Sequence, residues 1–182
     1  MADIRKQVVV LIDCWDYDKN DLDANVENNI RYHVFSNIKK SIANNHIDLI
    51  VDATYDNRTI HPELTSVASS KKCVKILELS DFENKVLSGN EPLDIYYMGM
   101  HWNQCIKNRP VGWENVLTVV KRKAVDCRIL FDPDTIVKMS WPDEIELYPT
   151  NFNNSGDLEK VILNNSIKSD KPIWQLRPNV TI

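Results

Sequence analysis

The chain has only four glycines in 182 residues, and they lie far apart. A loop that cradles phosphates with its backbone N–H groups needs several glycines close together. Long apolar runs are missing too, since none approaches the roughly 20 residues that a membrane-spanning helix needs. The composition therefore argues against a nucleotide bound through such a loop and against a membrane partner.

Excess positive charge is also missing. The chain carries 22 Lys and Arg against 26 Asp and Glu, a formal net charge of −4. Nucleic-acid-binding domains usually present a basic face, so we expect no nucleic-acid partner. The histidines are scattered without the spacing of metal ligands, and we expect no metal and no other cofactor.

The cysteines are few and widely spaced. Cys14, Cys73, Cys105 and Cys127 form no CxxC pair and are too sparse for a disulfide scaffold, which is typical of reduced thiols. The first residues lead into an apolar run without the organisation of a signal peptide. These features predict a cytoplasmic protein.

What the sequence does have is an alternation of apolar, strand-like runs with segments of helical periodicity. It predicts one α/β domain over residues 1–182, with a mostly parallel sheet and helices on both sides. Residues 54–72 are polar and contain Pro62, so we expect a long loop there with at most a short helix. The expected strands are residues 7–13, 47–51, 74–79, 93–98, 128–131 and 144–148, and the expected helices are residues 25–45, 113–123 and 157–164.

Candidate site residues follow these strands. Ligands of open α/β sheets bind beyond the carboxyl ends of the strands. Asp13 ends the first expected strand, Asp52 follows the second, and Cys105 follows the fourth. A thiol at the start of a helical turn meets outward-pointing N–H groups that favour the thiolate, and a neighbouring carboxylate could take its proton.

Each candidate also has a structural interpretation. An aspartate at a strand end often forms a turn or caps a helix, and this is the more common role for Asp52. A single cysteine beside apolar residues is more often a small core residue than a nucleophile. His101 could act as a base, although a histidine beside Trp102 more often packs or forms a hydrogen bond.

The motifs around Asp13 and Cys105 resemble the isochorismatase-like cysteine hydrolase superfamily, which includes nicotinamidases, N-carbamoylsarcosine amidase, ureidoacrylate amidohydrolases and isochorismatase. Its first strand ends in Ile-Asp-Met-Gln, where this chain has Ile-Asp-Cys-Trp, ending at Trp15. One bacterial branch reads Gly-Val-His-Thr-Asn-Met-Cys-Val-Leu-Gly-Arg-Pro-Phe-Gly. Residues 99–112 read Gly-Met-His-Trp-Asn-Gln-Cys-Ile-Lys-Asn-Arg-Pro-Val-Gly. Segments 130–135 and 154–158 resemble later parts of that branch in the same order.

The resemblance implies a Rossmann-like, three-layer α/β/α sandwich that hydrolyses the C–N bond of a small-molecule amide, and it implies a homo-oligomer. It places the nucleophile on Cys105 and the general acid/base on Asp13. It also implies a cis peptide before His101, which would turn the amides of His101 and Cys105 toward an oxyanion site. Trp15 and Trp102 replace a Gln and a Thr of the family and would narrow the pocket or offer a stacking surface.

The third catalytic residue of the superfamily is a lysine. Lys75 is its nearest match here, one position from the expected place, and Glu78 is a rival occupant. The zinc-binding Asp-x-His pattern of nicotinamidases is absent, because Asp52 is followed by Ala-Thr. Two alternatives to an amidohydrolase therefore stay open: an impaired family member acting as a binding or scaffold protein, and a vinyl-ether hydrolase like isochorismatase.

Overall fold

The protein is built on a mostly parallel central sheet. The computed structural model describes residues 4–15, 24–55, 58–100, 105–140, 144–146, 166–168 and 174–176. The strands of the sheet follow the order β3-β2-β1-β4-β5-β8-β7, and β6 pairs with β5 outside this path. Their bounds are β1 Lys6–Ile12, β2 Leu49–Ala53, β3 Cys73–Lys75, β4 Leu93–Met100, β5 Cys127–Ser140, β6 Glu144–Glu146, β7 Ser166–Lys168 and β8 Trp174–Leu176.

Strand β1 lies at the centre of the sheet because it is apolar on both faces. It pairs in parallel with β2 on one side and with β4 on the other. Val8 and Val10 belong to one apolar cluster, whereas Val9 and Leu11 belong to the other. All four are fully buried, as expected of a strand covered by helices on both faces.

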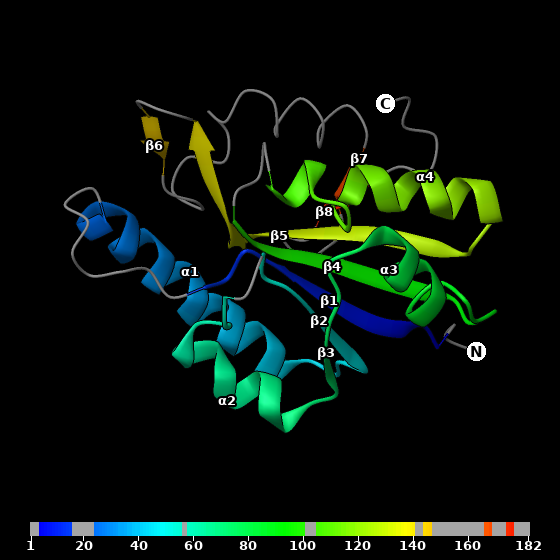
Figure 1. The fold of residues 1–182 in the computed structure, drawn as a ribbon, viewed down its shortest axis with the longest axis horizontal. Helices are drawn as coiled ribbons and strands as arrows, with labels where there is room; N and C mark the ends of the chain where they lie inside the picture. Colours follow the sequence, from blue (N-terminus) through cyan, green and yellow to red (C-terminus); the bar gives the residue numbers. More distant parts are fainter. Residues whose placement is uncertain are drawn as a thin grey trace.

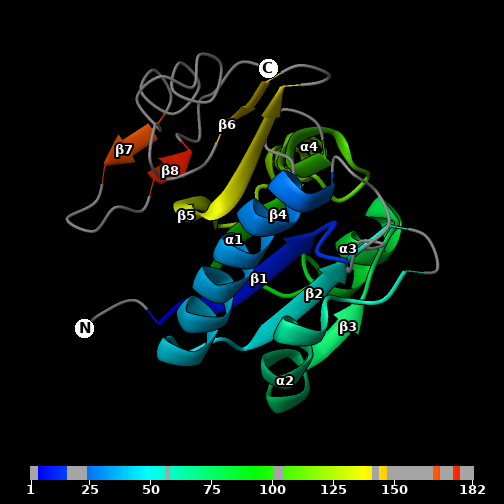
Figure 2. The ribbon, with the colours of Figure 1, turned by 90° about the vertical axis from the view of Figure 1, so that its left-hand side faces the viewer.

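Helices pack on the two faces of this sheet (Figures 1 and 2). α1, Ala24–Asn44, and α2, Pro62–Ser70, contribute to the cluster on one face. α3, Leu79–Lys85, and α4, Trp113–Lys123, contribute to the cluster on the other. The expected mostly parallel α/β fold is thus confirmed. None of the helices in the described part of the chain combines the length and apolarity needed to cross a bilayer.

The segment expected to be mostly loop holds a short helix, as the sequence allowed, and one expected strand was too long. Residues 54–72 contain helix α2, which begins at its N-cap His61, where the ring Nδ1 accepts the Glu63 N–H at 3.2 Å. Pro62 opens this helix because the first helical position needs no N–H donor. The strand expected over residues 74–79 ends at Lys75, and α3 begins at Leu79.

The far side of the sheet differs from a wholly parallel arrangement. β5 runs parallel to β4, with a register shift after Phe131, and continues well past the expected end of the strand. β8 pairs antiparallel with β5, and β7 pairs antiparallel with β8. The helix expected over residues 157–164 lies outside the described residues.

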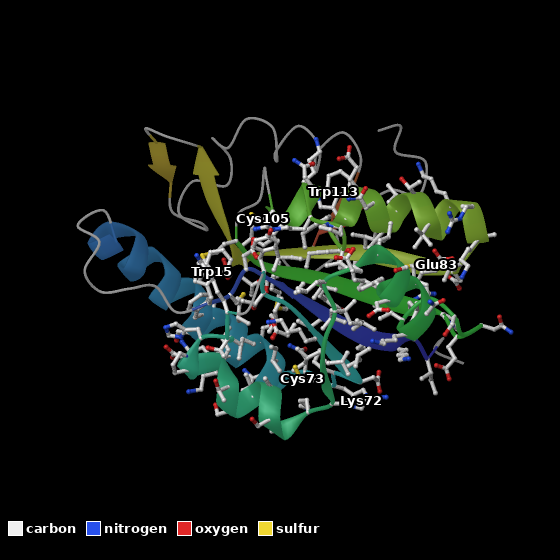
Figure 3. All side chains as sticks on the ribbon, viewed as in Figure 1. Trp15, Lys72, Cys73, Glu83, Cys105 and Trp113 are labelled. Carbon is white, nitrogen blue, oxygen red and sulfur yellow. The ribbon has the colours of Figure 1, made fainter. Side chains whose placement is uncertain are left out.

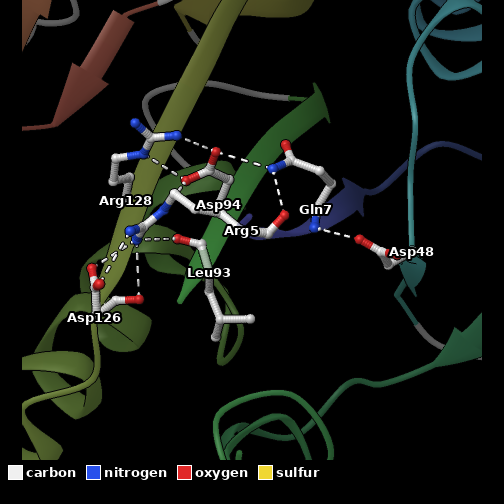
Figure 4. Close-up of polar contacts among 7 residues, drawn as sticks. All are labelled: Arg5, Gln7, Asp48, Leu93, Asp94, Asp126 and Arg128. Carbon is white, nitrogen blue, oxygen red and sulfur yellow. Dashed lines mark hydrogen bonds and ion pairs between the residues drawn. The ribbon is translucent and has the colours of Figure 1, made fainter. Parts of the chain in front are cut away.

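Ion pairs clamp the amino ends of three central strands (Figure 4). Asp94 on β4 is 2% exposed and accepts Arg5 Nε at 2.8 Å and a short hydrogen bond from Arg128 on β5. Burial alone would raise the pKa of Asp94, but hydrogen bonds from Arg128, Gln7 and Arg5 outweigh it and lower the pKa. Arg5 also pairs with Asp126 at 2.8 Å. The charged groups described at this amino edge are therefore paired with one another.

Candidate active site

Asp13 is held in place directly after β1. The residue has φ of 51°, a left-handed conformation that non-glycine residues seldom adopt. Its side chain is fully buried, and Oδ1 accepts the backbone N–H of Tyr55 at 3.1 Å. A strained backbone that presents a buried carboxylate at the carboxyl edge of the sheet is typical of functional positions. Asp13 thus lies directly after β1 at the carboxyl edge of the sheet, and its catalytic role stays a prediction.

Cys105 and Arg109 share one helical turn beyond β4. The backbone N–H of Arg109 donates to the carbonyl of Cys105 at 3.1 Å. Residues four apart on a helical turn face the same side. The turn closes tightly at Gly112, where an added Cβ would lie 2.4 Å from the Lys107 carbonyl oxygen. Glycine is therefore required there for the chain to leave the turn and enter α4.

Arg109 connects the turn of Cys105 to the end of β1. Its Nε and Nη2 both donate to Asp13 Oδ2, at 3.0 and 2.8 Å. Arg109 is partly buried, which opposes its charge, but the hydrogen bonds and charge of Asp13 and the charge of Cys105 outweigh burial and raise the pKa of Arg109. The structure thus gathers a thiol, a permanent cation and a buried carboxylate from two segments 96 positions apart.

The segment after β2 covers this group of residues. The Tyr55 ring lies against the guanidinium of Arg109, with the ring centroid 4.1 Å from Cζ. Trp15 forms a β-bridge with Ile60, and the His61 N–H donates to the Cys14 carbonyl at 2.8 Å. Figure 3 shows Trp15 and Cys105 toward the same end of the sheet. The described residues between β2 and α2 therefore frame the site, as the position of this segment after a strand end predicted.

Among the described contacts, Lys75 and Asp52 form hydrogen bonds with residues other than Asp13 and Cys105. Lys75 lies on β3 with an exposed side chain, and its Nζ donates to the Arg58 carbonyl at 2.9 Å. Asp52 lies within β2, and its Oδ1 accepts the Thr54 N–H at 2.9 Å, which shapes the turn that follows the strand. Glu78 is exposed and N-caps α3. The cation that contacts Asp13 is Arg109.

Several expected site features lie outside the described residues. They are His101, Trp102 and the peptide that joins Met100 to His101. The oxyanion site and the wall formed by Trp102 therefore stay predictions. Trp15 is described, and it is 8% exposed.

The contact between Arg109 and Asp13 was not predicted from the sequence. The motif resemblance included Arg109, but no chemistry was assigned to it. The available signal was its spacing of four positions from Cys105, which predicts that both side chains share one face of a helical turn. Tyr55 gave no sequence signal at all, because its contribution to Asp13 is a backbone N–H.

Two of the other thiols, Cys73 and Cys127, have environments that disfavour ionisation. Burial raises the pKa of Cys127 to about 12. Burial and then the charge of Asp52 raise the pKa of Cys73. The charge of Arg5 lowers the pKa of Cys127, but burial outweighs it, so Cys127 and Cys73 serve as internal references for thiol reactivity.

Within the described ranges, no group of three or more His, Cys, Asp or Glu side chains could hold a metal ion.

Comparisons with known proteins identify no family for this chain. No protein-family model matches the chain, and neither a curated protein nor a solved structure is significantly similar to it.

Proposed function

We propose that this protein is a cysteine hydrolase that cleaves a C–N bond of a small amide, with Cys105 as the nucleophile and Asp13 as the general acid/base. The proposal places the chain among the isochorismatase-like hydrolases with their three-layer α/β/α sandwich. Support for the fold comes from the parallel strands at the centre of the sheet and from apolar helix faces packed on both sides.

One observation carries the proposal: Arg109 pairs with Asp13 and shares a helical turn with Cys105. A guanidinium beside a thiol favours the thiolate, which is the reactive form. The same guanidinium orients the carboxylate that would exchange protons with substrate. Three components of nucleophilic catalysis are thereby assembled at the edge of the sheet where α/β enzymes bind ligands.

The carboxylate of Asp13 keeps one hydrogen-bond acceptor position that can receive a proton. An ionised carboxylate has about four acceptor positions. Oδ2 accepts two N–H groups from Arg109, and Oδ1 accepts one from Tyr55. One acceptor position on Oδ1 is left for the proton of the thiol, so the ion pair orients the base without saturating it.

The reaction then proceeds in two balanced steps. The sulfur of Cys105 bonds to the amide carbon while Asp13 takes the thiol proton. The C–N bond breaks, the nitrogen keeps the electron pair and takes that proton back from Asp13, and the amine leaves a thioester on Cys105. Water adds to the thioester with Asp13 as base, and cleavage of the C–S bond returns the thiol and releases the acid.

In this proposal Arg109 supplies the catalytic positive charge that the family resemblance assigns to Lys75. Arg109 suits this role because it lies on the same helical turn as Cys105. Its distance from the thiol therefore does not depend on how β3 pairs with β2. Lys75, held by the Arg58 carbonyl, supports the segment that covers the site.

The test is the reactivity of Cys105. We expect iodoacetamide at neutral pH to alkylate Cys105 well before Cys127, with a pH midpoint below that of a model peptide thiol. Mass spectrometry identifies the labelled cysteine, and Cys105→Ala and Cys127→Ala serve as matched variants. A burst of p-nitrophenolate from p-nitrophenyl acetate, lost in Cys105→Ala, reports the acyl-enzyme. Slow alkylation of Cys105 together with no burst would overturn the proposal.

A second candidate function is a binding protein that retains the fold without catalysis. The three N–H donors on Asp13 favour it, because a carboxylate engaged in this way can also act purely as a structural anchor. The same alkylation experiment separates the two candidates, since a binding protein has no need of a reactive thiol.

A further inference from the structure

Arg58 lies on the segment that covers the site, and its guanidinium has no anionic partner among the described residues. The side chain is exposed, and Cζ lies 4.4 Å from the centroid of the Trp15 ring. The contacts found for Arg58 are this stacking and the hydrogen bond that its carbonyl accepts from Lys75. Trp15 itself lies two positions after Asp13, the carboxylate of the proposed catalytic group.

Several contacts hold Arg58 in this position. Lys75 Nζ fixes the Arg58 carbonyl at 2.9 Å, and the bridge between Trp15 and Ile60 fixes the chain two residues further on. The indole then restricts the guanidinium plane. An arginine that is already ordered loses less conformational entropy when it binds a ligand than a freely rotating side chain does.

Stacking leaves the donor edge of a guanidinium available. Arg58 Cζ lies over the Trp15 ring, and the guanidinium N–H groups form no hydrogen bond or ion pair with the described residues. This planar fork matches a carboxylate or a phosphate, which it can bind with two parallel hydrogen bonds. Arg109 differs in this respect, since two of its N–H groups are committed to Asp13.

A second cation contacts the backbone of Arg58. Lys75 Nζ lies 2.9 Å from the Arg58 carbonyl oxygen. The acidic residue Asp52 lies on the neighbouring strand β2, where the pairing of β2 with β3 places it opposite Lys75. Asp13 is buried and paired with Arg109. The Tyr55 ring, 52% exposed, adds an apolar surface on the same segment.

We propose that Arg58, stacked on Trp15, is a specificity-determining residue that binds an anionic group of the substrate. The substrate is then a small amide that also carries a carboxylate or a phosphate group, with a planar part that can lie against Tyr55. This inference rests on the proposed hydrolase function, because it names the substrate class of the same site.

The test measures protection of Cys105 from iodoacetamide by small probes. Benzoate and inorganic phosphate are the two anionic probes, and benzyl alcohol is the neutral counterpart of benzoate. The variants are Arg58→Gln and, as a matched loss of one positive charge, Lys72→Gln at the amino end of β3, which Figure 3 shows away from Trp15. Calorimetric titration with the same probes measures binding independently of thiol reactivity.

We expect an anion to protect the wild-type protein and Lys72→Gln, and Arg58→Gln to bind that anion about tenfold more weakly, which is the loss of one charged hydrogen-bonding partner. Preference for benzoate identifies a carboxylate as the ligand, and preference for phosphate identifies a phosphate group. Equal binding of benzoate and benzyl alcohol, or an unchanged affinity in Arg58→Gln, would overturn the inference. If Cys105 is unreactive but calorimetry shows Arg58-dependent anion binding, the hydrolase proposal fails and the anion subsite stands.

Discussion

Replacing Arg109 with Met should destabilise the protein by removing the main partner of a buried charge. Asp13 is fully buried and accepts three N–H groups, two of them from Arg109. In Arg109→Met the carboxylate keeps only the Tyr55 amide. The methionine fills part of the volume but offers no donor, so the loss is electrostatic rather than a cavity.

The magnitude follows from the burial of the two partners. Breaking a buried ion pair by removing one side costs about 3–5 kcal/mol. Because the side chain of Arg109 is 28% exposed, water can reach the site of the lost guanidinium, and we expect the lower end, about 3 kcal/mol. In Asp13→Asn the guanidinium of Arg109 loses its carboxylate partner, but water still reaches its exposed side. We therefore expect the free energy of unfolding to fall by about 1 kcal/mol.

The double variant tests the reasoning. Asp13→Asn with Arg109→Met removes both charges, and we expect it to cost about 2 kcal/mol, less than the sum of the single variants. Urea unfolding followed by tryptophan fluorescence gives the three free energies, with Lys75→Met as a control that should change stability by under about 0.5 kcal/mol. Additive single and double effects would refute a direct buried pair between Asp13 and Arg109.

Three further predictions test other parts of the structure. Gly99→Ala should cost about 4 kcal/mol in urea unfolding, because φ is 109° and an added Cβ would lie 2.3 Å from the Ile12 carbonyl oxygen, whereas Gly89→Ala meets no atom closer than 3.9 Å and should be nearly neutral. Burial raises the pKa of Asp132 to about 6, so the folded state binds the proton more tightly than the unfolded chain; the contribution of Asp132 to stability is full below about pH 4 and falls by up to about 3 kcal/mol as pH rises through 6, and Asp132→Asn should abolish that part of the pH dependence. Alkylation of Cys105 by iodoacetamide should slow about tenfold in Arg109→Met and stay unchanged in Lys75→Met; equal rates in the two variants would contradict the role of Arg109.

Segments with a single strong pattern were predicted well from the sequence. The apolar run in β1 allows only a strand buried on both faces, and α4 was predicted with the bounds that the structure has. Helix α2 was allowed for only as a short helix without bounds, because its polar composition and Pro62 suggested a loop. Leu64 and Val67, three positions apart and buried against α1, were the signal for a helix.

The candidate site was predictable only in part, for a physical reason. Strand topology brings residues at strand ends together, so Asp13 and Cys105 could be placed at one edge from the sequence alone. Which cation joins them depends on side-chain rotamers and on the path of a loop. The spacing of Cys105 and Arg109 predicts a shared face of one turn, but it does not predict that the guanidinium reaches Asp13, and that contact required the structure.

The proposal of Arg109, rather than Lys75, as the cation beside Cys105 follows from how strands and helical turns position side chains. On β3 the side chain of Lys75 points to solvent while the next residue, Ile76, is fully buried, and a shift of one residue exchanges these faces. A cation donated from β3 is thus sensitive to a single slip in register. Arg109 is fixed relative to Cys105 by the hydrogen bond within their own turn, and it reaches Asp13 across the sheet edge. In the proposed mechanism the thiol and the cation share one turn, and Asp13 is brought to them from a distant segment, where the Tyr55 amide holds its carboxylate.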